Sequence, residues 1–340
     1  MTDGDGAKDG KDGKDAQTGA GGAGETGAQL PRATVARGTP TPGARRRRRS
    51  TGFGLGVAMF LPAVLYVLLL VGVPFGMAFF YAFSDARIGS GGDNFVGFEN
   101  FSSILESASF KTALKNSFIF TIASQILVLV GSTALALALK DKFRGRGFVR
   151  FLILLPWVAP ISLGAIGWKW ILDSIYSVVN WVLIALHLVK PFDKPMWLGQ
   201  PVLAMISVIT VHTWRLLPFS TVILLAGLTA IPRDIPEAAA VDGAGFWRTL
   251  FEITLPMLRP ILNVAMLFGI IFTFTDMIVV YVMTAGGPYD STQVLPSLAF
   301  FTGIQGSDLA AGAAISIFLV PLLVIVAFLM LRVAHRAEVT

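Results

Sequence analysis

The chain has 340 residues, of which 54% are hydrophobic and only 14% are charged, and its mean hydropathy is +0.70. These values exclude an ordinary soluble domain, and the absence of cysteine excludes a disulfide framework and a thiolate metal site. A net charge of +6 would suggest nucleic acid as the partner of a soluble protein, but most basic residues here flank apolar spans, so we expect membrane lipid around the chain and no nucleic acid.

The first segment, residues 1–50, is dominated by Gly, Ala, Asp, Lys, Thr and Pro. Such a composition cannot bury a core, so we expect a disordered basic tail on the cytoplasmic side, followed by a transmembrane domain over 51–340. The arginine run at 45–49 suits nucleic acid or anionic lipid, but its place before an apolar span favours a cytoplasmic stop for that helix. The apolar stretch is too long and begins too late for a cleaved signal peptide.

Six segments are long and apolar enough to cross the hydrocarbon core, which takes about 20 residues. A seventh apolar segment, 177–189, is too short to span and is predicted to be re-entrant or interfacial. Prolines 156, 160 and 218 are candidates for kinks within their helices. The predicted spans are 55–83, 117–139, 151–172, 202–228, 261–283 and 309–331.

Lysine and arginine are distributed unequally between the loops that join these spans. They crowd residues 140–150, recur in the loop 233–260 and follow the last span, whereas the loop 284–308 has none. Because basic residues concentrate in cytoplasmic loops, this pattern places the loop 233–260 and both termini in the cytoplasm. An even number of spans agrees with that topology.

The loop 233–260 begins with residues that favour a helix. Pro236 suits the first turn, Asp234 and Glu237 lie near the positive end of the helix dipole, and three alanines follow. Gly243 and Gly245 then permit a turn before a second short helix at about 246–253. A helix with a small face can seat closely in a groove of a partner protein, and charges at its rim fix the register.

The order of residues in this loop resembles the signature loop of the membrane subunits of binding-protein-dependent ABC importers. A Glu-Ala-Ala triplet, a spaced glycine and a closing Ile-x-Leu-Pro carry the likeness. These ATPase-coupling residues are Glu237, Ala238, Ala239, Asp242, Gly243, Ile253, Leu255 and Pro256. Shorter segments between about 95 and 332 resemble the carbohydrate-uptake members of the family, in the same order along the chain. The long tail and residues 305–308 depart from the family pattern.

The resemblance implies an all-α membrane protein with the type I ABC-importer permease fold, that is, six transmembrane helices with a cytoplasmic coupling helix. It implies a multi-pass protein of the cell membrane that shares a solute pathway with a second permease subunit. It also implies a dimer of ATP-binding subunits and an extracytoplasmic solute-binding protein as partners. The chain has no Gly-x-x-x-x-Gly-Lys-Ser/Thr phosphate loop, so we expect ATP and Mg²⁺ on the partner ATPase, no cofactor here and no enzyme activity.

Ionisable residues within the spans are candidates for the solute pathway, because they are costly in hydrocarbon. Arg215 lies about 20 Å along its helix from residue 202, His212 is one turn before it, and Asp276 interrupts the fifth span. Sugar sites combine such groups with aromatic rings. Trp168 and Tyr281 complete the predicted pathway, and the other available rings are Trp157, Trp170, Trp214 and Phe274.

Two questions about these residues stay open at the level of sequence. Arg215 and Asp276 either contact solute or form an internal ion pair, and Trp168 is either a sugar platform or part of an interfacial aromatic belt. Two other functions also remain possible. A secondary transporter driven by an ion gradient would need a midplane carboxylate, for which Asp276 is the candidate, and a membrane scaffold would leave the intramembrane charges unexplained. The identity of the solute is not readable from the chain.

Overall fold

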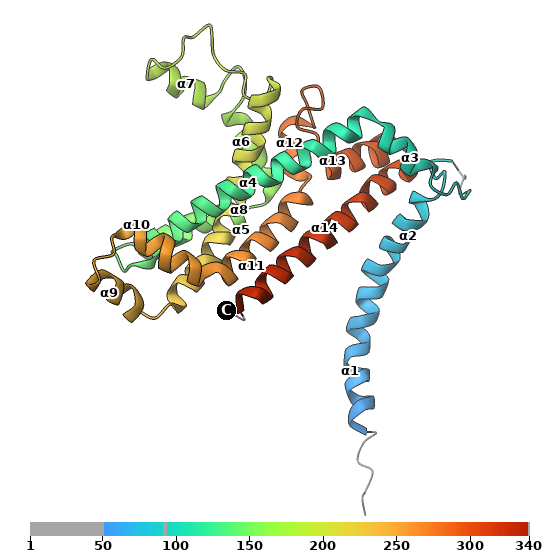
Figure 1. Ribbon diagram of the computed structural model, residues 1–340. Coiled ribbons are helices and arrows are strands. Elements are labelled where there is room, and N and C mark those ends of the chain that lie inside the picture. Colours follow the sequence, from blue (N-terminus) through green and yellow to red (C-terminus); the bar gives the residue numbers. More distant parts are fainter. Residues whose placement is uncertain (1–50, 91–93, 339–340) are drawn as a thin grey trace, which may run out of the picture. The chain divides into compact units, whose positions relative to one another are not determined.

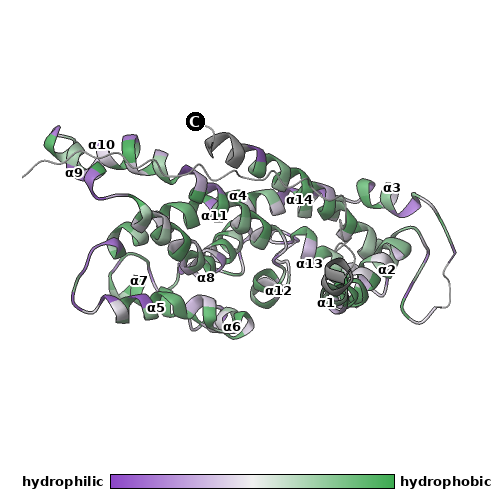
Figure 2. Cartoon of the chain, turned by 90° about the horizontal axis from the view of Figure 1, so that it is seen from below, coloured by the Kyte–Doolittle hydropathy of each residue, from purple (hydrophilic) through white to green (hydrophobic). Residues whose placement is uncertain are grey.

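The computed structural model describes residues 51–90 and 94–338, and its regular elements in that part of the chain are helices (Figure 1). The predicted tail over 1–50 lies outside the described residues. The chain divides into two compact units, one ending at Ala58 and the other beginning at Met59, and the second contains every helix from α2 onward. Hydrophobic residues dominate the helices and hydrophilic residues gather in the connections (Figure 2).

Five continuous helical stretches are long and apolar enough to cross a membrane, and a sixth span results if one sharply bent pair is counted. The first combines parts of α1 (Thr51–Val67), η1 (Leu68–Gly72) and α2 (Val73–Ala82). Counted with the bent pair, the total of six agrees with the predicted number of spans. The five stretches are Val57–Ala82, Ala108–Lys140 (α4), Pro201–Ala230 (α8), Phe246–Phe274 and Leu309–Arg332, the last within α14 (Leu309–Glu338).

The predicted span 151–172 is not one straight helix. Helices α5 (Arg146–Val158) and α6 (Ile161–Ile171) meet at 97°. The cause is Pro160, whose ring disfavours helical geometry in the preceding residue, and Ala159 is extended with ψ of 144°. Of the three candidate proline kinks, this one breaks the helix, whereas Pro156 and Pro218 lie inside helices that continue past them.

The predicted span 261–283 is not one helix, and its first part belongs to a longer helix that begins before residue 261. Helix α11 (Leu255–Phe274) continues without interruption from α10 (Phe246–Arg248) through the wider π-helical turn η2 (Thr249–Thr254). It then stops inside the predicted span, and α12 (Ile278–Thr284) starts after a break. The break occurs because the Asp276 carboxylate accepts hydrogen bonds from the backbone N–H groups of Ile278 and Val279, at 2.8 and 3.2 Å.

The remaining helices are short. In the loop between the third and fourth predicted spans, α7 (Val178–Ala185) begins at a Ser177 cap, and its eight residues are too few to cross a bilayer, as predicted for this segment. Helix α3 (Glu99–Glu106) precedes α4, and α13 (Leu295–Phe300) with η3 (Phe301–Gln305) precedes α14. Helix α9 (Asp234–Val241) lies in the loop after α8.

The second unit has three hydrophobic clusters among its described residues: one where α4, α8 and α11 pack together, one where α6 and α12 cover α8, and one where α2, α13 and α14 meet. Two glycines allow the helices to approach closely. A Cβ atom at Gly131 of α4 would lie 2.6 Å from Leu217 of α8, and one at Gly227 of α8 would lie 3.0 Å from Leu258 of α11. Close approach at small residues is typical of packing between membrane helices. This packing holds α8 firmly between its neighbours, and α8 carries His212 and Arg215.

Candidate functional site

The α9–α10 loop, as we call residues 233–248, presents part of the predicted coupling motif on its surface. Glu237, Ala238, Asp242 and Gly243 are exposed, whereas Ala239 is buried, on a helix that packs against η2. Gly243 has φ of +78°, a conformation that side chains with a Cβ atom resist, so the turn after α9 needs glycine. The loop therefore has one face turned inward and one turned to the surroundings.

The closing part of the motif has a different position. Ile253, Leu255 and Pro256 are half-buried where η2 leads into α11. The sequence predicted a separate short helix over 246–253, followed by these residues at the end of the loop. In the structure the helix that begins at Phe246 runs on to Phe274, so these residues lie inside it. These three residues fix the entry into the span, and the four exposed ones form the surface.

A group of aromatic residues on α10 and η2 was not predicted as functional. Phe246, Trp247 and Phe251 are exposed, and the rings of Trp247 and Phe251 stack with centroids 6.0 Å apart. On the same turn, the Nε of Arg248 donates to the Glu252 carboxylate at 2.9 Å. The spacing of Trp247 and Phe251, four residues apart, was the available signal, because it predicts that they share one helix face.

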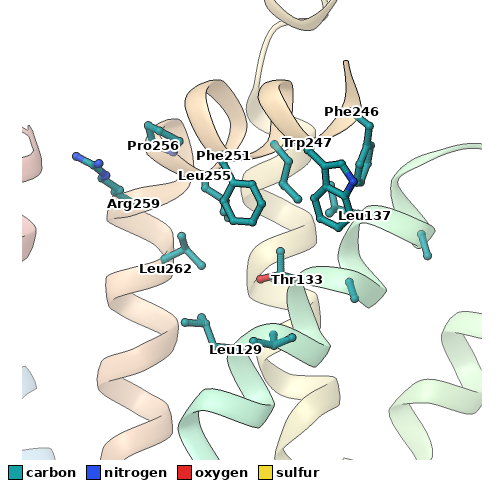
Figure 3. Close-up of a pocket in the computed structure, with 14 residues that line it drawn as sticks. Leu129, Thr133, Leu137, Phe246, Trp247, Phe251, Leu255, Pro256, Arg259 and Leu262 are labelled. Atoms are coloured by element: carbon teal, nitrogen blue, oxygen red, sulfur yellow. The ribbon is translucent and has the colours of Figure 1, made fainter. Parts of the chain in front are cut away.

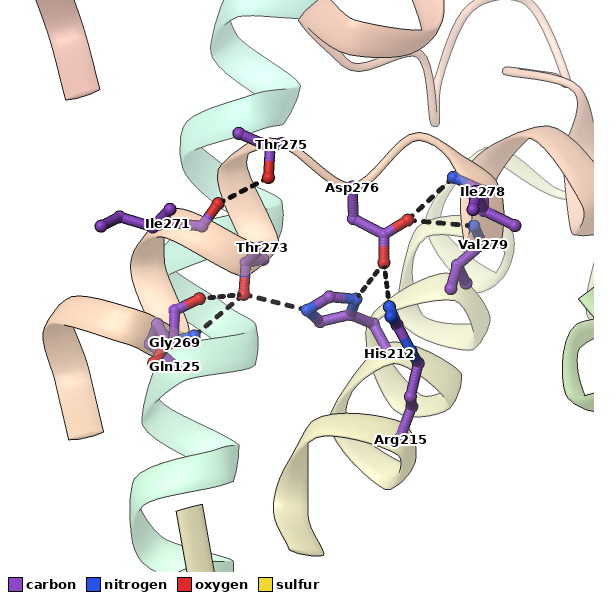
Figure 4. A network of polar contacts seen from close by, with 10 residues as sticks. All are labelled: Gln125, His212, Arg215, Gly269, Ile271, Thr273, Thr275, Asp276, Ile278 and Val279. Atoms are coloured by element: carbon purple, nitrogen blue, oxygen red, sulfur yellow. Dashed lines mark hydrogen bonds and ion pairs between the residues drawn. The ribbon is translucent and has the colours of Figure 1, made fainter. Parts of the chain in front are cut away.

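The second candidate site is a buried polar network between α4, α8 and the break after α11 (Figure 4). The Arg215 Nη1 donates to the Asp276 Oδ2 at 2.7 Å, and the His212 Nδ1 lies 3.1 Å from the same oxygen. The question left open by the sequence is thus answered in part: Arg215 and Asp276 contact each other. The polar network, as we name it, comprises Gln125, His212, Arg215, Thr273 and Asp276.

Thr273 joins the two halves of the polar network. Its hydroxyl donates to the Gly269 carbonyl at 2.7 Å and accepts from the Gln125 Nε2 at 2.9 Å, and the His212 Nε2 lies 2.9 Å from the same hydroxyl oxygen. Gly269 leaves the space for the Gln125 amide, because a Cβ atom there would come within 2.9 Å of it. Gln125 and Thr273 were not predicted, since single polar residues in a span carry no distinctive pattern.

The polar network is closed on one side and partly open on the other. The side chains of His212 and Asp276 are 0% and 3% exposed, but that of Arg215 is 28% exposed. Its guanidinium carbon lies 5.9 Å from the centroid of the Trp157 ring, a distance at which a cation and an aromatic face attract each other. Arg215 is therefore the member of the polar network whose side chain is partly exposed.

An aromatic cluster continues from Trp157. The ring of Trp157 stacks on Phe219 at 4.8 Å and approaches Phe272 at 5.8 Å, and Phe268 lies 6.2 Å from Phe219. We call Trp157, Phe219, Phe268 and Phe272 the aromatic cluster. Phe268 and Phe272 are exposed, so the cluster borders the surface beside Arg215.

The other predicted pathway residues lie elsewhere. Trp168 packs edge-on against Trp214 at 5.7 Å, and Tyr281 packs against Phe300 and Phe301 at 5.4 and 5.7 Å. Neither takes part in the hydrogen bonds of the polar network among the described residues. Phe274, one of the available rings, is buried against Phe118 and has no face free for a sugar.

Comparison with known proteins bears on both sites. The family model of the inner membrane component of binding-protein-dependent transport systems matches residues 128–339, which include the α9–α10 loop and every member of the polar network except Gln125. The trehalose/maltose transport system permease protein MalF of Thermococcus litoralis is 34% identical over 263 residues, or 77% of this chain and 88% of that protein.

Two solved structures have the same fold. One, a bacterial ABC transporter involved in the import of the acidic polysaccharide alginate, matches with a TM-score of 0.71 at 22% identity over 83% of this chain and 96% of that chain. The other, a bacterial alginate ABC transporter in complex with an alginate pentasaccharide-bound periplasmic protein, matches with a TM-score of 0.65 at 23% identity over 84% and 92%. The predicted type I importer permease fold is confirmed. With a family model that covers most of its length and a relative 34% identical, this multi-pass membrane protein belongs to the ABC-transporter permeases that form the inner membrane component of binding-protein-dependent transport systems.

Proposed function

We propose that this chain is a permease subunit of an ATP-driven importer for a sugar or sugar-like solute. With a second permease it forms the solute pathway, and separate ATP-binding subunits drive it through the α9–α10 loop. The observation that carries the proposal is the exposed face of that loop, where small residues and two acidic residues lie together in the order typical of the family.

The exposed face has the chemistry of a docking surface. Val241, at the end of α9, is 88% exposed, and Ala238 is exposed on the same helix. An apolar surface made of small side chains loses little conformational entropy when a partner groove covers it. Glu237 and Asp242 lie beside it and supply the charges that orient a partner.

The source of energy follows from where this loop lies in the sequence. The distribution of lysine and arginine predicts a cytoplasmic position for the loop and for both termini, which is the side where ATP is available. The chain contains no phosphate-binding loop, so ATP and Mg²⁺ are bound by the partner subunits. The loop then transmits their movement to α8 and α11, which flank it in the chain.

The solute pathway in this proposal passes Arg215 and the aromatic cluster. Aromatic rings stack on the apolar faces of sugars, and a guanidinium donates hydrogen bonds to hydroxyl or carboxylate oxygens. Asp276 pairs with Arg215 on the buried side of the guanidinium. The side chains of His212 and Asp276 are buried, so they do not touch the solute. The relatives named for trehalose/maltose and for alginate support a carbohydrate as the solute class.

The solute arrives from the opposite side of the membrane on an extracytoplasmic binding protein. The alginate transporter solved with its pentasaccharide-bound periplasmic protein supports this part of the assembly. The alternative, a carrier driven by a proton gradient, needs a midplane carboxylate that is free to take up a proton. Asp276 is instead paired with Arg215 at 2.7 Å, which argues against that alternative.

Uptake by the reconstituted assembly tests the proposal. Vesicles would contain this chain, a second permease and the ATP-binding subunits, with the binding protein and labelled oligosaccharides added outside. We expect uptake with ATP, none with a non-hydrolysable analogue and none with a proton gradient alone. Uptake driven by the gradient in vesicles that hold this chain by itself would overturn the proposal.

The pathway has its own test. Replacement of Trp157 by Ala removes a ring from the aromatic cluster, whereas Trp157→Phe keeps one. We expect Trp157→Ala to raise the KM for uptake about fivefold, the equivalent of roughly 1 kcal/mol, with the assembly intact. Trp157→Phe should recover most of the affinity. An equal KM in both variants and in the unmodified chain would exclude this ring from the pathway.

A further inference from the structure

An apolar groove with a volume of about 810 Å³ lies between α4 and the segment from α10 to α11 (Figure 3). Its size falls within the range of about 300–1,000 Å³ that is usual for ligand pockets. Its lining includes Leu255 and Pro256 from the closing part of the coupling motif, but none of the four exposed coupling residues and no member of the polar network. Its main lining residues are Leu129, Thr133 and Leu137 of α4, Trp247 of α10, Phe251 of η2 and Leu262 of α11.

The groove runs along one half of the membrane span. Its lining on α4 extends from Leu129 to Ala138, a rise of about 14 Å, which is close to half of the roughly 30 Å hydrocarbon core. Helix α4 ends shortly afterwards at Lys140, a basic residue of the kind found at the membrane surface. The groove therefore faces a single leaflet, the one on the side of the α9–α10 loop.

Aromatic residues mark the end of the groove at the membrane surface. In Figure 3, Phe246 and Trp247 lie at that end, and Leu129 lies at the deep end. Trp247 is 66% exposed despite its size. Tryptophan is enriched at the boundary between hydrocarbon and headgroups, so these rings are suited to contact the upper part of an acyl chain.

A positive charge completes the rim. Arg259 borders the groove on α11 and is exposed, and it takes part in none of the ion pairs found among residues 51–90 and 94–338. The stem of an arginine can lie along an apolar wall while its guanidinium stays at the level of the headgroups. An apolar channel with one unpaired cation at its surface end matches a molecule that has a hydrocarbon chain and a phosphate.

We propose that the groove binds an anionic phospholipid from the leaflet on the side of the α9–α10 loop. One acyl chain lies between α4 and α11, and the headgroup phosphate is bound by Arg259. The lipid fills the space beneath Trp247 and Phe251 and thereby supports the turn through which the α9–α10 loop is joined to α11. This inference depends on the membrane position of the chain and not on the solute or on ATP.

Photolabelling of the complete importer tests the proposal. The assembly would be placed in nanodiscs of phosphatidylcholine with phosphatidylglycerol that carries a photoreactive diazirine in one acyl chain. We expect the label on peptides that contain residues 129–138 and 246–262. Ala134→Trp fills the groove and should lower this labelling about tenfold, the equivalent of about 1.4 kcal/mol. Ile122→Trp, at a residue of the same helix that is 57% exposed and outside the groove, should leave it unchanged.

Arg259→Gln separates the headgroup from the chain. We expect it to abolish the preference for phosphatidylglycerol over a phosphatidylcholine probe with the same diazirine, a change of about fivefold, because one basic residue near an anionic surface contributes roughly 1 kcal/mol. Thr133→Leu narrows the groove with a smaller change and serves if Ala134→Trp does not assemble. Labelling spread evenly over the exposed spans would overturn the proposal. A photoreactive amino acid at position 134 that crosslinks to the second permease and not to lipid would overturn it as well.

Discussion

The α9–α10 loop and the polar network contain similar chemical groups in opposite situations. In the loop, Glu237 and Asp242 are exposed, and neither takes part in an ion pair or a side-chain hydrogen bond among the described residues. In the polar network, each charged or polar side chain has a partner within the chain. The buried members of the network have their partners within the chain, whereas the acidic residues of the loop are free to contact another molecule.

The difference follows from the surroundings of each region. Unpaired charges are tolerated at an aqueous surface, where water solvates them, but a buried charge without a partner costs several kcal/mol. Substitutions in the network should therefore change the stability of the chain first. Substitutions on the exposed face of the loop should change association and transport while stability is kept.

The largest effect is expected from Asp276→Leu. It leaves Arg215 and His212 without their common acceptor, and we expect a loss of about 3–5 kcal/mol in stability. Thermal unfolding of the purified assembly measures it. The double variant with Arg215→Met removes the unpaired charge and should recover part of this loss, because the cap on α12, worth about 1 kcal/mol, and the partner of the buried His212 ring are still missing. Equal stability of the single and double variants would contradict the pairing.

The next effect concerns the loop. Ala238→Trp places a large ring on the exposed face of α9, and we expect binding of the ATP-binding subunits and ATP-driven uptake to fall about tenfold or more, with unchanged thermal stability. Co-purification and uptake measure this. Ala239→Trp should destabilise the loop instead, because Ala239 is buried, and Lys142→Gln on the neighbouring basic loop should change neither. Retained ATPase binding in Ala238→Trp would exclude the docking role.

Two threonines at the end of α11 allow a buried and an exposed position to be compared directly. The hydroxyls of Thr273 and Thr275 both donate to the carbonyl four residues earlier, but only Thr273 belongs to the polar network. Thr273→Val should cost about 1–3 kcal/mol, because it leaves Gln125 and His212 without their hydroxyl partner. Thr275→Val should cost less than about 0.5 kcal/mol, since Thr275 is exposed. Equal costs in chemical unfolding would refute a special role for Thr273.

The smallest effect is expected from Arg248→Gln. It removes the exposed ion pair with Glu252, four residues along the helix, and such pairs contribute less than about 0.5 kcal/mol. Thermal unfolding at low and high salt should hardly distinguish the variant from the unmodified chain. A large loss of uptake at unchanged stability would instead assign Arg248 to the docking surface.

Much of the fold followed from local patterns in the sequence. Apolar length predicted the number of spans, and four residues of the loop motif are exposed, while its role in docking stays a prediction. The break at Pro160 follows from the restriction that proline puts on its predecessor. The error over 261–283 arose because Asp276 was treated as an interruption within one helix, whereas its carboxylate replaces backbone hydrogen bonds and starts another.

The interior of the site was less accessible from the sequence. His212 and Arg215 are three residues apart, so their common face was predictable. Their meeting with Asp276 depends on how α8 packs beside α11, and no local pattern reports that packing. Gln125 joins the polar network from a distant helix for the same reason.

The spans also differ in how much of each is enclosed by the chain itself. Half of the most apolar window of α8 is buried within the protein, whereas none of the corresponding window of Val57–Ala82 is. The conformation of α8 thus depends little on detergent or lipid. The side chains of the first span contact molecules outside this chain, so its conformation depends on them. In a purification, the choice of detergent or lipid should decide the conformation of the first span. A preparation can be well folded around His212 while the first span lacks the contacts that it makes in the membrane.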